Sequence, residues 1–265
     1  MAESGERRMV FDVRGRRKHV VRVVYAILAV LMGASLFLVV GPFNLSSLVG
    51  GGGVTSAAKI DQEQVQKIEE KLRRQPKDEA LLLALTRAHV IAAGALSETN
   101  PETGLAVPTA EAVREYSGAL ESWASYLKQT DEPNPSTARA VAETYIKMAE
   151  VSRTIEESNA NIAKAAKTQR IAATAQPSLG SLSLLATYEY FAGNYAQGDK
   201  AAAEATKKTT KTEAKEVTKK LAATRARAKQ YEREVREFAK AEKEKGKEAL
   251  KNPFGGLGGS PSIGG

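Results

Sequence analysis

The longest apolar stretch of the chain runs from Val23 to Phe43 and contains no charged residue. Its 21 residues would form a helix about 30 Å long, which matches the hydrocarbon core of a bilayer. The stretch lacks the polar face that a helix at the edge of a soluble core would have. We therefore expect a single transmembrane helix at Val23–Phe43, through which the chain contacts a membrane.

Charged residues on the two sides of this span predict its orientation. Residues 1–22 carry seven Lys or Arg and three acidic residues, whereas residues 44–59 carry one charge, Lys59. Because basic residues beside a span stay in the cytoplasm, we expect the N-terminus inside and the rest of the chain outside the cytoplasmic membrane, in a periplasmic or extracellular space. A cleaved signal peptide is the alternative, but the stretch is longer than a usual h-region and no A-x-A triplet follows it.

The chain after the span divides into a tether, a helical region, a long basic helix and a tail. Residues 44–59 are rich in Gly and Ser, as is typical of a flexible linker. Beyond them, apolar residues recur every three or four positions, which predicts an all-α structure. We expect the helical domain over residues 60–206, the long helix over 207–251 and a disordered Gly-rich tail over 252–265.

Capping and turn residues set the expected helix boundaries. Asp78 and Thr109 precede periodic segments, and Ser136 or Thr137 precedes another, so each is expected to cap a helix. The predicted helices span Asp61–Arg74, Glu79–Ala95, residues 109–128, two helices within 138–175 that break near Ser158–Asn159, Leu182–Ala192, Tyr195–Thr206 and about Glu213–Leu250.

The apolar residues of the last helix predict how much of it packs. Leu221, Tyr231, Val235 and Phe238 form a short stripe, so the helix would begin as a cap on the domain. Its second half has too few apolar positions to be buried. We expect this second half to project into solvent, and we expect deletion of residues 230–265 to leave the helical domain folded.

The window Ser181–Ala205, SLSLLATYEYFAGNYAQGDKAAAEA, resembles a tetratricopeptide repeat. Leu185–Ala186 match the Leu-Gly/Ala pair of that family's first helix, and Gly193–Asn194–Tyr195 match its inter-helix turn. Gly198 stands where the family places a small residue at a tight contact. Two further units begin at Leu82 and Val141, although a loop over residues 97–108 departs from the family's length in the first of them.

The resemblance implies a solenoid of stacked helical hairpins of bacterial type, in which small residues let the helices approach closely. Members bind peptides or partner helices on the concave surface that the first helices line. By register, the partner-binding residues implied here are Arg87, Arg139, Thr187 and Tyr190. The implied function is a membrane-anchored adaptor or scaffold that assembles protein complexes outside the cytoplasm.

Net charge differs between segments, and the last helix carries the largest excess. Residues 23–205 carry −4, whereas residues 206–251 carry +8. The densest positive patch contains Lys219, Lys220, Arg225 and Arg227. The alternative function is therefore a structural protein that tethers the envelope by binding anionic lipid or wall polymer. Interleaved acidic residues also suit an isolated, solvated helix, and with only Tyr231 nearby for base stacking we expect no nucleic acid.

Residues suited to catalysis or metal binding are scarce. The chain has no cysteine and two histidines, which excludes disulfides, thiolate metal sites and thiol catalysis. His19 lies among basic residues before the span, and His89 falls on an inner helix face, where we expect it to be packed. No metalloprotease, phosphate-loop or serine-hydrolase motif occurs. We expect no cofactor, no metal ion and no enzymatic activity.

Overall fold

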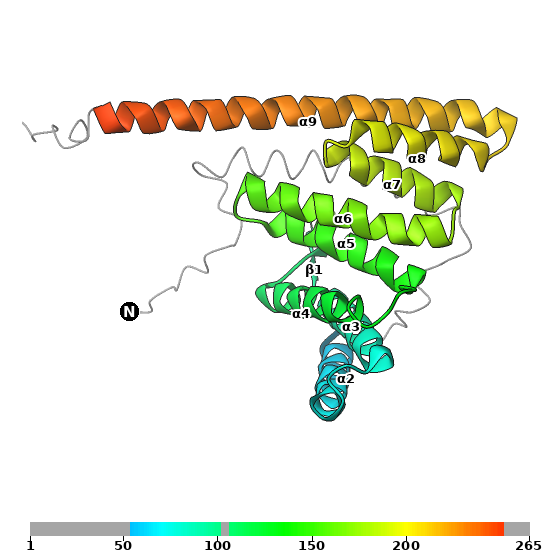
Figure 1. Cartoon of the computed structure of the whole chain (residues 1–265). Coiled ribbons are helices and arrows are strands. Elements are labelled where there is room, and N and C mark those ends of the chain that lie inside the picture. Colours follow the sequence, from blue (N-terminus) through cyan, green and yellow to red (C-terminus); the bar gives the residue numbers. More distant parts are fainter. Residues whose placement is uncertain (1–53, 102–105, 252–265) are drawn as a thin grey trace, which may run out of the picture.

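The structure, a computed structural model, describes residues 54–101 and 106–251, with side chains for 61–101 and 106–241. This part of the chain is all-α apart from one two-residue antiparallel pairing (Figure 1). Its elements are α2 (Val54–Arg74), α3 (Glu79–Ala95), β1 (Glu98–Thr99), β2 (Ala106–Val107), α4 (Ala110–Tyr126), α5 (Pro135–Val151), α6 (Ile155–Ala175), α7 (Leu179–Phe191), α8 (Tyr195–Lys207) and α9 (Lys211–Lys251).

Side-chain caps begin most of these helices. Asp78 accepts a hydrogen bond from the Leu81 N–H at 2.8 Å, and Thr109 accepts one from Ala112 at 3.1 Å, which confirms both predicted caps. These oxygens satisfy N–H groups that have no partner within the first turn of a helix.

Two predicted helix starts are wrong. Helix α5 is capped by Asn134 rather than Ser136 or Thr137, because Pro135 takes the first helical position, where its missing N–H costs nothing. Helix α2 begins at Val54 rather than Asp61, so residues 54–59, assigned above to the linker, are helical.

The break between α5 and α6 also differs from the prediction. It lies at residues 152–154, where Thr154 caps α6, and not at Ser158–Asn159. Ser158 lies inside α6, buried, and donates to the Ala149 carbonyl at 3.1 Å. Ser158 therefore binds across the turn between α5 and α6, and Asn159 accepts a hydrogen bond from Tyr231 of α9, so neither residue ends a helix.

Consecutive helices pack as three hairpins, α3 with α4, α5 with α6, and α7 with α8. The hairpins stack along the molecule, with α2 packed against α3 at one end and α9 against α7 and α8 at the other (Figure 1). The largest apolar cluster joins α5, α6, α7, α8 and α9. Each hairpin has too small an apolar stripe to form a core alone, so stacking stabilises them jointly.

Two glycines allow close approach within hairpins. A Cβ on Gly198 of α8 would lie 2.4 Å from the Tyr190 ring, so the ring occupies the space a larger residue would need. Gly118 of α4 lies against the His89 ring in the same way. His89 is buried, as expected, and its Nδ1 lies 2.7 Å from Glu115 Oε2.

An ion pair between a buried carboxylate and a half-exposed guanidinium joins the second and third hairpins. Glu189 of α7 is fully buried and is paired with Arg170 of α6. Its second oxygen accepts a hydrogen bond from the Asn194 amide at 2.9 Å, in the turn before α8. Because loss of Arg170 would leave the buried Glu189 carboxylate without its charge partner, these contacts help to hold α7 against α6 and against the turn before α8.

Helix α9 is packed further along its length than predicted. Val217, Leu221, Ala228 and Tyr231 are all buried, at spacings of four, seven and three residues, which place them on one face of the helix. Tyr231 packs against Phe191 and donates to Asn159 Oδ1 at 2.8 Å. The packed part therefore continues past Gln230, and the boundary placed there from the sequence is too early.

Among the described helices, none combines the length and the apolar composition needed to cross a bilayer. The predicted span, Val23–Phe43, lies outside the described residues, as does the predicted tail at 252–265.

Candidate functional site

The first helices of the first two hairpins, α3 and α5, each carry a row of exposed or partly exposed side chains. On α3 it contains Arg87 and Ile91, and the Ile91 side chain is the most exposed large hydrophobic in the described part of the chain, at 58%. On α5 it contains Arg139, Glu143 and Lys147, spaced four residues apart. We call these five residues the α3/α5 stripe.

Contacts within the stripe hold its charged groups in place. Arg87 Nε donates to Thr137 Oγ1 at 2.8 Å, which links the middle of α3 to the first turn of α5. Arg139 pairs with Glu143 at 3.5 Å, and Lys147 pairs with Glu150 at 3.2 Å. The stripe therefore combines one exposed apolar side chain on α3 with alternating charges on α5.

Two carboxyl groups of α5 are crowded by protein. Burial raises the pKa of Glu143 and of Glu150, against the opposing effect of Arg139 on the first and of Lys147 on both. The Glu143 side chain is nevertheless 41% exposed, so solvent still reaches it, whereas Glu150 is only 8% exposed and its Oε1 has no hydrogen-bond donor. Glu143 is thus the carboxylate of this pair that a partner can contact.

Tyr188 of α7 is buried near the two carboxyl groups of α5. Burial, followed by the charges of Glu143 and Glu150, raises the pKa of Tyr188 well above its ordinary value. The phenol therefore stays neutral at physiological pH and keeps a proton beside the two carboxyl groups.

The structure places the four residues expected in a concave surface in two different environments. Arg87 and Arg139 are accessible on the α3/α5 stripe. Thr187 and Tyr190 are 2% exposed, and all ten residues from Leu182 to Phe191 are buried. Thr187 donates to the Ser183 carbonyl, and the Tyr190 hydroxyl donates to Asp199 Oδ1. Neither side chain is available to a partner in this structure.

The four basic residues singled out on the last helix do not form one patch. Arg225 makes two hydrogen bonds to the Asp199 carboxylate, at 2.8 and 3.1 Å, and its guanidinium lies 5.5 Å from the Tyr195 ring centre. Lys220 pairs with Glu216 at 3.8 Å. Since a helix turns by about 100° per residue, Arg225 and Arg227 project from opposite flanks of α9.

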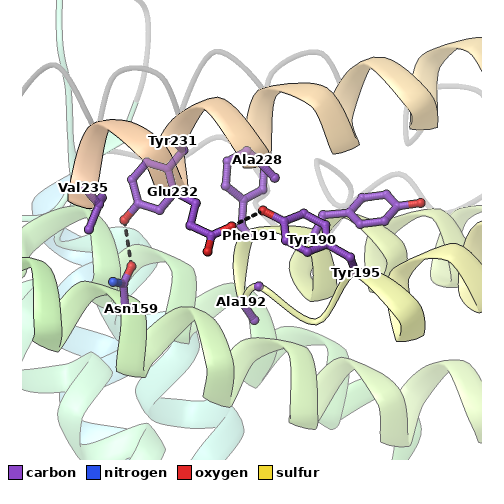
Figure 2. Close-up of a pocket in the computed structure, with 10 residues that line it drawn as sticks. Asn159, Tyr190, Phe191, Ala192, Tyr195, Ala228, Tyr231, Glu232 and Val235 are labelled. Atoms are coloured by element: carbon purple, nitrogen blue, oxygen red, sulfur yellow. Dashed lines mark hydrogen bonds between the residues drawn. The ribbon is translucent and has the colours of Figure 1, made fainter. Parts of the chain in front are cut away.

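A pocket of about 190 Å³ lies where the α7–α8 turn meets α9 (Figure 2). Its wall includes Phe191, Ala192 and Val235, with polar groups from Asn159 and Glu232. Figure 2 shows the polar groups engaged with one another, Tyr231 with Asn159, and Tyr195 with Glu232 at 2.9 Å. Burial raises the pKa of Tyr231 to about 12, so its hydroxyl remains the donor at neutral pH. The contacts join α9 to the stack.

Among the residues whose positions are described, no three His, Asp or Glu side chains lie close enough together to hold a metal ion. Sequence reasoning missed Ile91 and Glu143, because an apolar residue and an acidic residue on a helix are ordinary in isolation. These residues are grouped because α3 packs against α5 in the folded chain. Sequence register had already indicated that Arg87 and Arg139 lie on this surface.

No protein family matches the sequence, no curated protein resembles it, and no solved structure matches its fold.

Proposed function

We propose that the chain is a single-pass, membrane-anchored adaptor or scaffold with tetratricopeptide-like repeats. Val23–Phe43 would hold it in the cytoplasmic membrane, and the helical stack would recruit a partner protein on the outer side. The proposal gives the chain no catalytic role. The observation that carries it is the α3/α5 stripe, which combines an exposed isoleucine on α3 with an accessible ion pair on α5, two helices that the Arg87–Thr137 hydrogen bond joins.

The composition of the stripe supports protein recognition over a purely solvated surface. Protein interfaces combine a few apolar anchors with polar groups that fix orientation. Ile91 would serve as the anchor, since its burial would remove apolar surface from water. Arg139 and Glu143, held by each other, would supply a donor and an acceptor with little loss of side-chain freedom.

The repeat assignment rests on two features of the hairpins. The helices pair in the order that the three sequence units require, α3 with α4, α5 with α6 and α7 with α8. The turn after α7 contains Gly193 at a positive φ, and Gly198 sits at the tight contact between α7 and α8.

Affinity capture with matched variants tests the proposal. Ile91→Ser and Arg139→Ala should each weaken partner capture about tenfold at low salt. The loss caused by Ile91→Ser should persist in high salt because an apolar anchor is not screened. Leu127→Ser is the control, since Leu127 is the other large hydrophobic exposed among the described residues and lies at the end of α4, outside the stripe. Equal loss in the control, or none in the stripe variants, would contradict the proposal.

A further inference from the structure

The buried seam of α9 divides the rest of the helix into two flanks of different charge. Val217, Leu221, Ala228 and Tyr231 define the seam that faces α7 and α8. Among the residues of α9 whose side chains are described, and with about 100° of rotation per residue, one flank carries seven basic residues and is bordered by Glu232 on one side and Glu237 on the other. We call it the basic flank, and its residues are Lys211, Lys215, Arg225, Lys229, Arg233, Arg236 and Lys240.

The opposite flank is mixed. It carries three basic residues and four acidic ones, which are Lys219, Lys220, Arg227, Glu213, Glu216, Glu234 and Glu237. Three of the four bases singled out from the sequence lie here, among acids. The positive charge of α9 is therefore concentrated on a face that counting along the sequence does not reveal.

Contacts with α8 fix the direction of the basic flank. Arg225 is bound to Asp199, and the Lys229 ammonium lies 5.6 Å from the centre of the Tyr195 ring. These two contacts hold α9 against α8 in this orientation. Arg236 is paired with Glu232 within α9. Lys211, Lys215, Arg233 and Lys240 remain exposed along the same side.

The shape of the flank suits a flat partner. From Lys211 to Lys240 the helix advances about 44 Å, and it runs straight along one edge of the molecule (Figure 1). A flat surface such as a bilayer can contact every charge of a straight, rigid row at the same time. A flexible polymer does not need the charges to lie in a straight row. Ala222 and Ala226, which lie between the charges, leave no bulky side chain in the way.

We propose that the basic flank of α9 docks on the anionic lipid headgroups of a bilayer surface. The flank carries no large apolar side chain, so the attraction is electrostatic and involves no insertion. Basic residues near an anionic surface contribute additively, and three of them account for about a hundredfold in the ratio of docked to undocked protein. The basic flank is separate from the α3/α5 stripe, so lipid docking and partner binding can be tested independently.

Energy transfer from α9 to the membrane tests this docking. The chain has no cysteine, so Ala222→Cys places a unique dye on the basic flank, and Ala223→Cys places one on the mixed flank. The full chain is mixed with phosphatidylcholine vesicles, with or without phosphatidylglycerol, that carry an acceptor on their headgroups. Transfer from position 222 should be high only with phosphatidylglycerol and should exceed transfer from position 223. It should fall at high salt, where charges are screened beyond about 3 Å.

Two triple variants give the matched comparison, because each removes three positive charges from exposed positions of the same helix. Neutralising Lys215, Arg233 and Lys240 to Gln should lower docking about a hundredfold. Neutralising Lys219, Lys220 and Arg227 to Gln should leave docking within a few-fold. Equal effects of the two sets would show a general charge attraction and would overturn the assignment to the flank.

Sedimentation with the same vesicles keeps anchoring distinct from docking. If high salt abolishes energy transfer from position 222 but the protein still sediments with the vesicles, the protein is anchored in the membrane and its basic flank docks separately through charge. A second arm adds polyphosphate, a soluble anionic polymer. Binding of polyphosphate at position 222 without a response to anionic vesicles would contradict the proposal, as would the absence of transfer to phosphatidylglycerol vesicles.

Discussion

Gly193 ends α7 in a conformation that other residues rarely adopt. Its φ is +80°, its N–H donates to the Tyr190 carbonyl, and the Asn194 N–H donates to the Glu189 carbonyl at 2.8 Å. This is the Schellman arrangement, which satisfies carbonyls at the end of a helix and favours glycine. The same turn includes the Asn194 amide that supports buried Glu189.

Gly193→Val should therefore lower the free energy of unfolding by about 1–3 kcal/mol, because a β-branched residue is strained at positive φ. Thermal melting followed by circular dichroism measures the effect, and each kcal/mol corresponds to about 2–4 °C for a domain of this size. Gly94→Ala is the control, since a Cβ there meets nothing within 4 Å, and it should be neutral or slightly stabilising. Equal melting temperatures for the Gly193→Val variant and the wild type would contradict this account of the turn.

Glu150 makes stability depend on pH. Burial raises the pKa of this carboxyl in the folded state, so the folded protein holds the proton more firmly than the unfolded chain does. That contribution is fully present below the unfolded pKa, near 4.5, and is lost as pH rises through the higher folded pKa. Glu150→Gln should remove this loss. The variant should therefore gain melting temperature over the wild type at pH 7, and this gain should shrink at acidic pH.

The control for this prediction is Glu121→Gln, since Glu121 is exposed on α4. Chemical unfolding at several pH values gives the comparison. A Glu150→Gln variant that keeps the full pH dependence of the wild type, or that is less stable at neutral pH, would show that the buried carboxylate is compensated by groups other than Lys147.

At the scale of the element, α9 separates into a packed part and an exposed part. A chain ending at Ala241 keeps Tyr231 and its contacts with Phe191 and Asn159. A chain ending at Lys229 loses them. The first truncation should leave thermal stability unchanged, whereas the second should cost about 3 kcal/mol or more, as expected when a buried aromatic side chain is removed. Equal stability of both truncations would restore the earlier boundary at Gln230.

Local signals account for the elements that the sequence predicted correctly. Asp78 and Thr109 act on N–H groups three residues away, so the chain order alone identifies them. The break before α6 also had a local signal, since Thr154 and Glu157 form the spacing of a capping box. The polar pair Ser158–Asn159 was the weaker indication, because both residues are bound within the fold.

Burial of the α7 residues could not be predicted from the sequence in the same way. Periodicity identified Thr187 and Tyr190 as lying on one helix, but their exposure depends on what packs beside them. Gly198 of α8 lies against the Tyr190 ring, and Asp199 accepts its hydroxyl. Such contacts between elements decide which part of a predicted surface stays open, and they leave only Arg87 and Arg139 of the four accessible.

At the scale of the whole molecule, the proposed topology predicts where each end of the chain lies. A reporter enzyme that is active only outside the cytoplasm should be active when fused after Gly53 and silent when fused before Arg14, because the basic N-terminus is expected to stay inside. The full-length mass should also persist in washed membranes. A mature chain that begins after Phe43 would show a cleaved signal peptide instead, and an inverted reporter pattern would overturn the orientation.

Site-specific photo-crosslinking in the native host tests the central claim most directly, that the α3/α5 stripe receives a protein partner. A photoreactive amino acid at Ile91 or Glu143 should yield one and the same crosslinked protein, identified by mass spectrometry, and Arg139→Ala should diminish both products. The same probe at Leu127, exposed on α4, should not yield that product. Crosslinks to that protein from Leu127 but not from Ile91 and Glu143, or different products at the two stripe positions, would contradict the account.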